Sequence, residues 1–385
     1  MGGRGDAGDK RAYCDRLKDE SDRLPRRGAD LGEDGSEPGA TGESEPAFAG
    51  RVLEIEGEPC MRLGLCFDGF YSITEMVELA GLADEAGMDS IWMSDHLCFR
   101  DSVASSMAFL TTTRRIKVVP APLSPYSRPP IVSAMAVATM EEMAQGRVAM
   151  TVGTGNPMAL EEVGIKVTRP LKTMREYVQL LRAFLSGETV DFDGEIFRVK
   201  GAKLGLKTTS PMSIYMTAVR PKMLRLAGEI GDGVLLSAGC APRYIAQCVT
   251  EIRTGAERAG KSPAESDIAG FITTSVSDNA KEAIEASKTF LAYVFRNKHH
   301  AENIRMGGAQ VGQEGLVAVV AKRDWEGAKK LISDEVVFAH SISGTPSDCR
   351  GRLGQFIEAG LNLPILLPMG TQEARKKVVE LAREL

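Results

Sequence analysis

Two short apolar runs flank one helical stretch between Lys117 and Asn156, and this arrangement limits the fold more than any other part of the chain. The run Lys117–Ala121 ends at a proline-rich corner, segment 130–144 has the apolar spacing of a helix, and the run Val148–Val152 ends at the glycine turn GTGN. Strand, helix and strand in this order form a βαβ unit, which requires a parallel sheet. Because function in parallel α/β sheets lies where strands end, both corners are candidate site segments.

The same alternation repeats from Met61 to the end of the chain. The predicted strands are Arg62–Phe67, Ser90–Ser94, Lys117–Ala121, Val148–Val152, Ser213–Thr217, Val234–Ser237, Ile268–Val276 and Pro364–Pro368. The predicted helices are 73–86, 102–112, 130–144, 171–186, 221–230, 242–259, 278–294 and 372–384. Eight strands, each followed by a helix, predict a (β/α)8 TIM barrel with insertions, and a doubly wound open sheet is the alternative.

Two insertions interrupt the alternation. Segment 188–206 contains two alternating runs around Asp193-Gly194, which predicts a β-hairpin. Segment 295–345 is mixed, with a helical run near 322–333, and we expect it either to cover the mouth of the barrel or to form an oligomer contact.

Residues 1–60 differ in composition from residues 61–385. They are rich in Gly and charged residues and contain few apolar ones, so we predict a disordered extension before one folded domain. One hypothesis is that translation starts naturally at Met61. The net charge of −5 falls mainly in this extension, and neither part has the basic excess of a nucleic-acid binder.

Membrane and export signals are not found in the sequence. No run of about 18 apolar residues predicts a transmembrane helix, and the first 50 residues contain no apolar core of a signal peptide. The seven cysteines show no CxxC or metal-ligand spacing, which favours a reduced, cytoplasmic protein. His299 and His300 are expected to be a polar surface pair, so no metal site is predicted.

The second predicted strand, SIWMS, leads directly into Asp95 and His96. A histidine at the carboxyl end of a barrel strand faces the usual active site and can transfer protons near neutral pH. We therefore take His96 as a candidate catalytic residue, with a structural histidine as the alternative. Asp95 could orient His96, cap the following turn or bind a ligand.

Two loop segments are further candidates. The turn Thr154-Gly155-Asn156 is either a plain tight turn or a close approach of backbone to a flat or anionic ligand, and Met158 rules out the GxGxxG pattern. Arg220 and Lys222 flank Pro221 at a predicted helix start. This is a possible phosphate site, with a solvated basic helix start as the alternative.

Four segments in this order resemble the luciferase-like flavin-dependent oxidoreductases. They are AGMDSIWMSDH, LSPYSRPPIVSAMAVATMEEMAQGRVAMTVGTGNP, RPKMLRLAGEIGDGVLLS and GTPSDCRGRLGQFIEAGLNLPILLP. The similarity is greatest to the branch that uses the deazaflavin coenzyme F420, typified by methylenetetrahydromethanopterin reductase. The resemblance implies a TIM barrel with the coenzyme ring at its carboxyl-terminal mouth.

The resemblance also implies roles for individual residues. Asp95 and His96 would be catalytic, Asp95 contacting the coenzyme and His96 acting as an acid or ring contact. The corner after the third strand, including Pro120, Ala121 and Leu123, would hold a non-prolyl cis peptide bond behind the ring. The other coenzyme-binding positions would be Thr154, Gly155, Asn156, Val219, Arg220, Lys222 and Met223.

One departure from the family narrows the expected activity. Sugar-phosphate dehydrogenases of this type have a glutamate base where this chain has Asn156, so the proton-transfer role falls to His96. We expect hydride transfer between coenzyme F420 and a small organic substrate, with a homodimer as the usual assembly. The alternatives are an FMN-dependent monooxygenase on the same barrel and a non-catalytic coenzyme-binding barrel.

Overall fold

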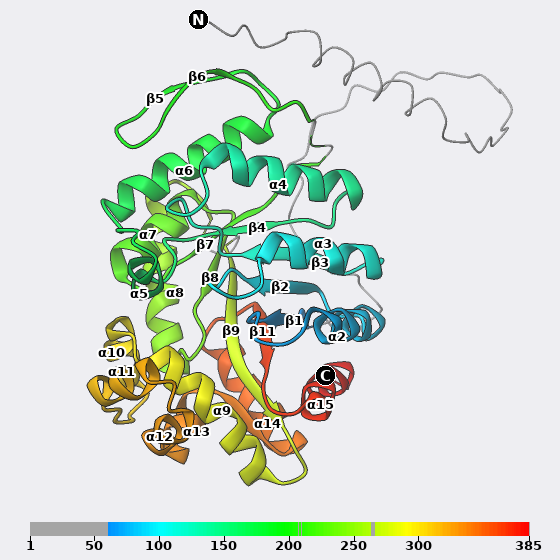
Figure 1. Cartoon of the computed structure of the whole chain (residues 1–385), viewed down its shortest axis with the longest axis vertical. Helices are drawn as coiled ribbons and strands as arrows, with labels where there is room; N and C mark the ends of the chain where they lie inside the picture. The colour runs from blue at the N-terminus through cyan, green and yellow to red at the C-terminus, as the bar shows by residue number, and fades with distance from the viewer. Residues whose placement is uncertain (1–60, 207, 209, 263–265, 385) are drawn as a thin grey trace, which may run out of the picture. The chain divides into compact units, whose positions relative to one another are not determined.

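The eight predicted strands are all present in the computed structural model, which describes residues 61–206, 208, 210–262 and 266–384 (Figure 1). The predictions for residues 1–60 lie outside this range. The strands are β1 Gly64–Phe67, β2 Ser90–Ser94, β3 Lys117–Ala121, β4 Met150–Val152, β7 Ile214–Thr217, β8 Gly233–Leu236, β9 Asp267–Val276 and β11 Leu363–Pro368.

These strands pair in parallel in the order β3-β2-β1-β11-β9-β8-β7-β4. Between the two end strands, isolated bridges join Val118 to Val148 and Leu123 to Val152. The sheet is thereby nearly closed on itself, which confirms the predicted barrel rather than the open sheet. One short strand that we did not predict, β10 Ile342–Gly344, pairs with the end of β9.

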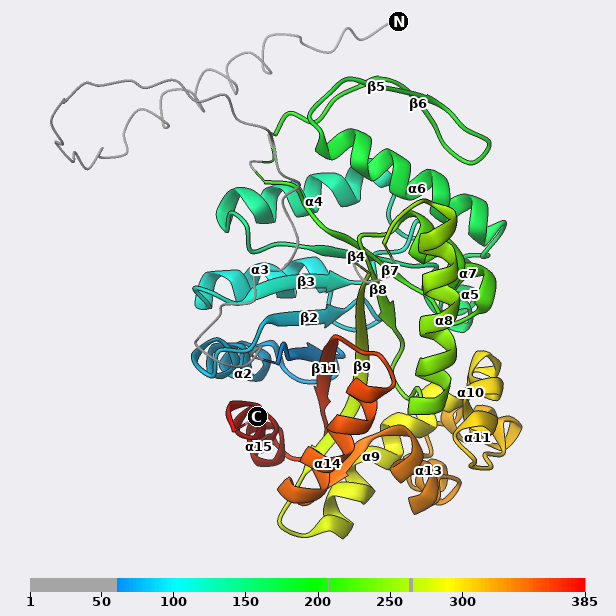
Figure 2. The same cartoon turned by 180° about the vertical axis from the view of Figure 1, so that it is seen from behind.

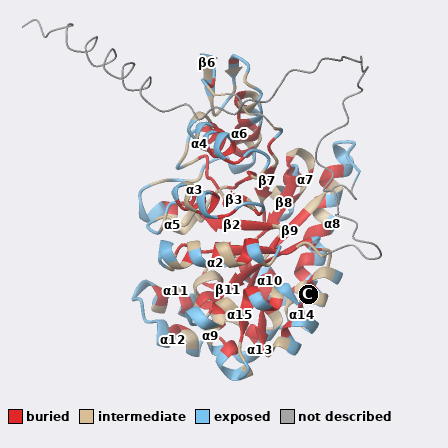
Figure 3. Cartoon of the chain, turned by 90° about the vertical axis from the view of Figure 1, so that its right-hand side faces the viewer, coloured by how far each residue is buried: buried red, intermediate tan, exposed pale blue. Residues whose placement is uncertain are grey.

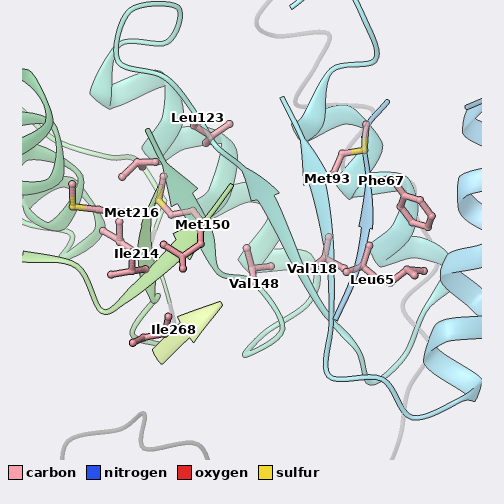
Figure 4. Packing of buried hydrophobic residues seen from close by; sticks show 14 of the residues in the cluster. Leu65, Phe67, Met93, Val118, Leu123, Val148, Met150, Ile214, Met216 and Ile268 are labelled. Atoms are coloured by element: carbon pink, nitrogen blue, oxygen red, sulfur yellow. The ribbon is translucent and has the colours of Figure 1, made fainter. Parts of the chain in front are cut away.

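Barrel strands bury both faces, because alternate side chains point inward and outward. In β1, Leu65 and Phe67 pack outward in the layer under the helices, and Cys66 packs inside the barrel. Figure 4 shows Leu65, Phe67 and Met93 in the outer layer. Inside, Trp92 lies edge-on to Tyr215 with ring centroids 5.1 Å apart, so large side chains fill the barrel.

Helices surround this ring and leave their outer faces exposed, as Figure 3 shows. They are α2 Ile73–Glu85, α3 Ser102–Thr112, α4 Pro130–Met143, α6 Pro170–Leu185, α7 Pro221–Ile230, α8 Pro242–Arg258, α14 Pro346–Glu358 and α15 Gln372–Arg383. The short helix α5 Pro157–Glu162 follows β4. Ser72 caps α2 by accepting a hydrogen bond from Glu75 N at 3.2 Å, and Gly87 follows the helix with φ 78°.

The prediction missed α14. Its sequence contains Gly351 and Gly354, and only Cys349, Leu353 and Phe356 are buried, so the apolar period is weak. The predicted helix 278–294 is α9 Ala280–Phe295, which leads into the second insertion.

The first insertion is the predicted hairpin, formed by β5 Val190–Asp193 and β6 Arg198–Ala202. Asp193 pairs with Arg198, so the loop of the hairpin spans residues 194–197. The buried carboxylate of Glu176 on α6 accepts hydrogen bonds from the backbone of Glu195, Ile196 and Phe197 at 3.0, 2.9 and 3.0 Å. A side chain distant in sequence therefore fixes the loop.

The second insertion follows α9 and consists of the turn Lys298–His300, α10 Ala301–Met306, α11 Gln313–Ala321, α12 Trp325–Lys330 and α13 Asp334–His340. These helices gather at one end of the barrel, as Figure 2 shows, and share a separate apolar core that includes Leu316 and Val336. Asn303 Nδ2 and His340 Nδ1 both lie within hydrogen-bonding distance of the Gly239 carbonyl after β8, at 2.7 and 2.8 Å. This shared carbonyl is one of the contacts that join the insertion to the barrel.

The expectation of a polar surface pair at His299 and His300 is wrong for His300. That ring is buried, with its centroid 5.7 Å from the Phe295 ring centroid. In the part of the chain that the structure describes, no helix is long and apolar enough to cross a membrane. Within the same residues, no cluster of three or more His, Cys, Asp or Glu side chains could hold a metal ion.

Candidate active site

A cavity of about 1180 Å³ lies over the carboxyl ends of the strands. Its walls come from the loops after β1, β2 and β4 and from the insertion, and they include Asp68, Phe70, Tyr293 and Arg296. A smaller pocket of about 40 Å³ adjoins it at the strand ends and shares wall residues with it, including Tyr293. Arg296 belongs to segment 295–345, so this segment contributes to the cavity wall, which is consistent with the expectation that it covers the mouth.

The small pocket brings together several predicted site residues from separate strand ends. It is lined by Asp95, His96, Leu97, Pro122, Ser124, Ser127, Gly155, Asn156, Ala159, Leu160 and Tyr293. The segments after β2, β3 and β4 therefore meet in one place, as expected for the carboxyl ends of adjacent parallel strands.

His96 is held among aromatic rings. Its ring centroid lies 5.7 Å from that of Phe70 and 6.2 Å from that of Tyr293, and its buried Nδ1 has no hydrogen-bond partner among the described residues. Burial lowers the pKa of His96 to about 4; the negative charge of Asp95 opposes this shift, and the positive charge of Arg296 adds to it. The imidazole is therefore neutral at pH 7 and has a free position for a proton at Nδ1, but it is a weaker base than an exposed histidine.

Asp95 has a different environment from the one expected for a partner of His96. Its carboxylate accepts a hydrogen bond from Ser102 N at 3.3 Å and forms an ion pair with Arg128 Nε at 3.5 Å. No hydrogen bond between Asp95 and His96 occurs in the described structure. Of the three roles considered from the sequence, the capping of the following segment is the one observed.

The corner after β3 carries a cis peptide bond, but it is Ala121–Pro122. The expectation of a non-prolyl cis bond is wrong, and the bond formed is of the X-Pro type that accounts for nearly all cis peptides. Ala121 and Leu123 are fully buried, in the barrel interior and the outer layer respectively, and Pro120 is also buried. Pro122, which the sequence did not single out, is the residue of this corner that lines the pocket.

The glycine turn after β4 forms the floor of the small pocket. Gly155 has φ 75°, and a Cβ there would lie 3.1 Å from Leu160 Cδ1, so glycine is needed both for its conformation and for space. Thr154 O accepts a hydrogen bond from Ser124 Oγ at 3.2 Å. Asn156 Oδ1 caps α5 by accepting from Met158 N at 3.1 Å, which leaves the NH2 group of Asn156 for a ligand.

Asp68 was missed by the sequence analysis although it directly follows β1. It is 1% exposed, it lines the large cavity, and its Oδ2 has no hydrogen-bond partner among the described residues. Burial raises the pKa of Asp68 to about 6. Its position at a strand end is the signal that could have identified it.

The two cations of the predicted phosphate segment after β7 line different cavities. Arg220 lines a cavity of about 330 Å³ together with Lys298 and His299, whereas Lys222 lines a separate cavity between α6 and α7. Val219 O accepts a hydrogen bond from the Tyr244 hydroxyl.

Met223, the fourth predicted residue of this segment, packs against the outer core. Both cations predicted at this helix start line pockets with other cationic side chains: Arg220 with Lys298, and Lys222 with Lys172, Arg175, Arg225 and Arg258. Lys298 and His299 could not be found from the sequence, because they come from the insertion.

Comparisons with known proteins agree with this geometry. Residues 61–363 match the luciferase-like monooxygenase family. A 5,10-methylenetetrahydromethanopterin reductase from Archaeoglobus fulgidus is 33% identical over 326 residues, covering 83% of this chain and 97% of the relative. An F420-dependent glucose-6-phosphate dehydrogenase from Mycolicibacterium gilvum is 29% identical, covering 78% and 90%.

Solved structures give the same fold. The coenzyme F420 dependent tetrahydromethanopterin reductase from Methanopyrus kandleri superposes with a TM-score of 0.77 at 24% identity, covering 84% of this chain and 97% of that one. The family resemblance drawn from the four sequence segments is thus confirmed. The chain belongs to the luciferase-like monooxygenase family.

Proposed function

We propose that this protein is an oxidoreductase that transfers hydride between coenzyme F420 and a small organic substrate. The observation that carries the proposal is the large cavity over the strand ends, which adjoins the pocket of His96, Gly155 and Asn156. The relatives named above support the choice of coenzyme. When bound, the coenzyme supplies the hydride chemistry, and the protein supplies orientation, proton transfer and exclusion of water.

The residues present fit a flat coenzyme with an anionic tail. The small pocket is far below the roughly 300 Å³ of a typical ligand site, so a three-ring group would lie in the large cavity with one edge against the strand ends. There, Gly155 allows close approach, and the NH2 group of Asn156 offers a donor. Arg220 and Lys298 would hold the anionic tail.

The protein's own groups would handle the proton. A neutral His96 would accept the proton that a substrate releases when it gives up hydride, and return it in the reverse direction. Asp95 would act indirectly, because its contacts to Ser102 and Arg128 fix the segment that carries His96.

We further propose a cytoplasmic homodimer that acts on a small molecule, without nucleic-acid or membrane partners. The five described cysteines are all free thiols, which supports a reducing compartment. Light scattering of the purified protein tests the dimer.

Coenzyme binding is the direct test of the function. Purified protein is titrated with coenzyme F420 and, separately, with FMN, and binding is followed by fluorescence. The proposal expects binding of coenzyme F420. Binding of FMN alone would overturn it in favour of the monooxygenase alternative, and binding of neither would favour a non-catalytic barrel.

Two neighbouring cations give a matched pair of variants. Arg220→Met removes a charge from the proposed tail pocket, so we expect it to weaken binding of coenzyme F420 by about tenfold or more. Lys222→Met removes the same charge two residues away, in a different cavity, and should leave the affinity unchanged. Equal effects of both variants would contradict the proposed tail pocket.

A further inference from the structure

Arg296 is a buried cation with no acidic partner in the described structure. It is the C-cap of α9, it is 7% exposed, and it lines the large cavity. Its guanidinium carbon lies 3.7 Å from the centroid of the Tyr293 ring, and one N–H donates to the Tyr293 carbonyl. A guanidinium has five N–H donors, so most of its hydrogen-bonding capacity remains for a ligand.

A second buried arginine that stacks on a tyrosine, Arg375, shows which kind of group such a guanidinium binds. Arg375 is 6% exposed, and its guanidinium carbon lies 3.8 Å from the centroid of the Tyr71 ring. Two of its nitrogens, Nε and Nη2, donate to the carboxylate of Glu75. Both arginines are therefore stacked on a tyrosine and almost fully buried, but among the described residues only Arg375 has a carboxylate partner. Burial of an unpaired charge is costly, which favours an anion supplied from outside.

The cavity around Arg296 also limits the rest of the ligand. Phe70, Phe290 and Tyr293 line it, with ring centroids of Phe70 and Tyr293 5.6 Å apart. Aromatic walls favour a flat apolar body. At about 1180 Å³ the cavity exceeds the roughly 300–1,000 Å³ of a single small-molecule site, so it has room for a coenzyme ring and a substrate.

We propose that the substrate of this enzyme is a flat, largely apolar carboxylate, and that Arg296 binds its carboxylate as Arg375 binds Glu75. This inference names the substrate class of the site described above and rests on the proposed function. Arg296 is then a specificity-determining residue, and the insertion supplies it.

The test compares two probes that differ only in charge, 2-naphthoate and 2-naphthamide, by calorimetry on the full chain. Wild-type protein should bind 2-naphthoate at least about tenfold more tightly, and Arg296→Met should abolish that preference. Arg323→Met removes an exposed arginine from the wall of the same cavity and should keep the preference. Arg296→Lys retains charge without the fork, so an intermediate preference is expected.

Because the preference is a ratio measured on one protein sample, a partial loss of folding in Arg296→Met does not mimic the expected result. Equal binding of the two probes to wild type, no binding of either at millimolar concentration, or a preference that persists in Arg296→Met would overturn the proposal.

Titration with coenzyme F420 separates this inference from the proposed function. Affinity for the coenzyme should change less than about threefold in Arg296→Met; a loss as large as that for 2-naphthoate would assign Arg296 to the coenzyme and overturn the proposal. If wild type fails to bind the coenzyme but prefers 2-naphthoate through Arg296, the proposed function fails and the anion site stands.

Discussion

Two polar atoms at the mouth of the barrel, Asp68 Oδ2 and His96 Nδ1, have no hydrogen-bond partner among the described residues, and both residues have perturbed acid–base chemistry. Burial reverses the usual order of the two pKa values, to about 6 for Asp68 and about 4 for His96. Buried polar groups without partners cost stability, and such groups concentrate at functional sites. The sequence indicated His96 because it follows a strand end and the chain has only four histidines, whereas Asp68 also follows a strand end but is one aspartate among many.

Asp68→Asn tests the energetic consequence. The carboxyl retains its proton to about pH 6 in the folded state but ionises near 3.8 when unfolded, so its contribution to stability falls as pH rises between these values. The amide of asparagine does not ionise, so the variant lacks the free-energy cost of a buried negative charge. We expect the variant to exceed wild type by about 2 kcal/mol in unfolding free energy at pH 8, and by much less at pH 4.

Urea unfolding of both proteins at the two pH values measures this difference. A variant that is less stable than wild type at pH 8, or a difference that does not change with pH, would contradict the assignment of Asp68 as a buried, unpaired acid.

At the scale of elements, local residue patterns predicted which helices and strands form, whereas contacts between residues distant in sequence determined where their loops lie. The hairpin β5–β6 followed from its alternating residues, but the loop position depends on Glu176, which lies on α6. The same limit applies to Lys298 and Arg296: nothing near them in sequence indicates a ligand, and their role depends on how α9 folds back over the strand ends.

Glu176→Gln tests the control of the hairpin. The amide cannot accept from all three backbone N–H groups, so at least one donor is left unsatisfied, at a cost of roughly 1–3 kcal/mol. We expect faster hydrogen exchange at residues 195–197.

The matched control is Glu195→Gln, which alters an exposed carboxylate in the same loop that pairs with Arg169 and Lys172. It should leave this exchange nearly unchanged, since exposed ion pairs contribute little. Similar exchange in both variants would show that Glu176 does not hold the loop.

For the whole molecule, the two ends of the barrel have separate tasks. At the amino-terminal end, Arg62 Nε lies 3.1 Å from Asp89 Oδ1, and its Nη1 lies 3.1 Å from Asp267 Oδ1. Asp267 also accepts from the Tyr215 hydroxyl, so one network links β1, β2, β7 and β9. The candidate site lies at the opposite ends of the strands, as in other barrels of this type.

Arg62→Met should therefore reduce stability without reducing coenzyme affinity. Loss of the guanidinium leaves Asp89 and Asp267 without their cation, and since Arg62 is partly exposed we expect about 1–3 kcal/mol. Urea unfolding and titration with coenzyme F420 measure the two properties. Weaker coenzyme binding in a folded variant would show that the two ends are coupled.

The positions of the strands along the chain were accessible from sequence because barrel strands are apolar on both faces and end at turn residues. That periodicity is enough by itself to predict that His96, Gly155 and Asn156 lie at one mouth of the barrel. The strand periodicity does not predict the part of the cavity wall that α9 supplies, because the insertion has its own core and no strand period.

The attachment of the insertion through Gly239 has an evolutionary consequence. Since α9–α13 pack around their own core, and Asn303 and His340 contact the Gly239 carbonyl from outside that core, substitutions in the core need not disturb the strand ends. A lineage could thus acquire new substrates by altering the insertion while its coenzyme chemistry stayed constant. Divergence among such barrels should accumulate first in the insertion and last at the turn that carries Gly155.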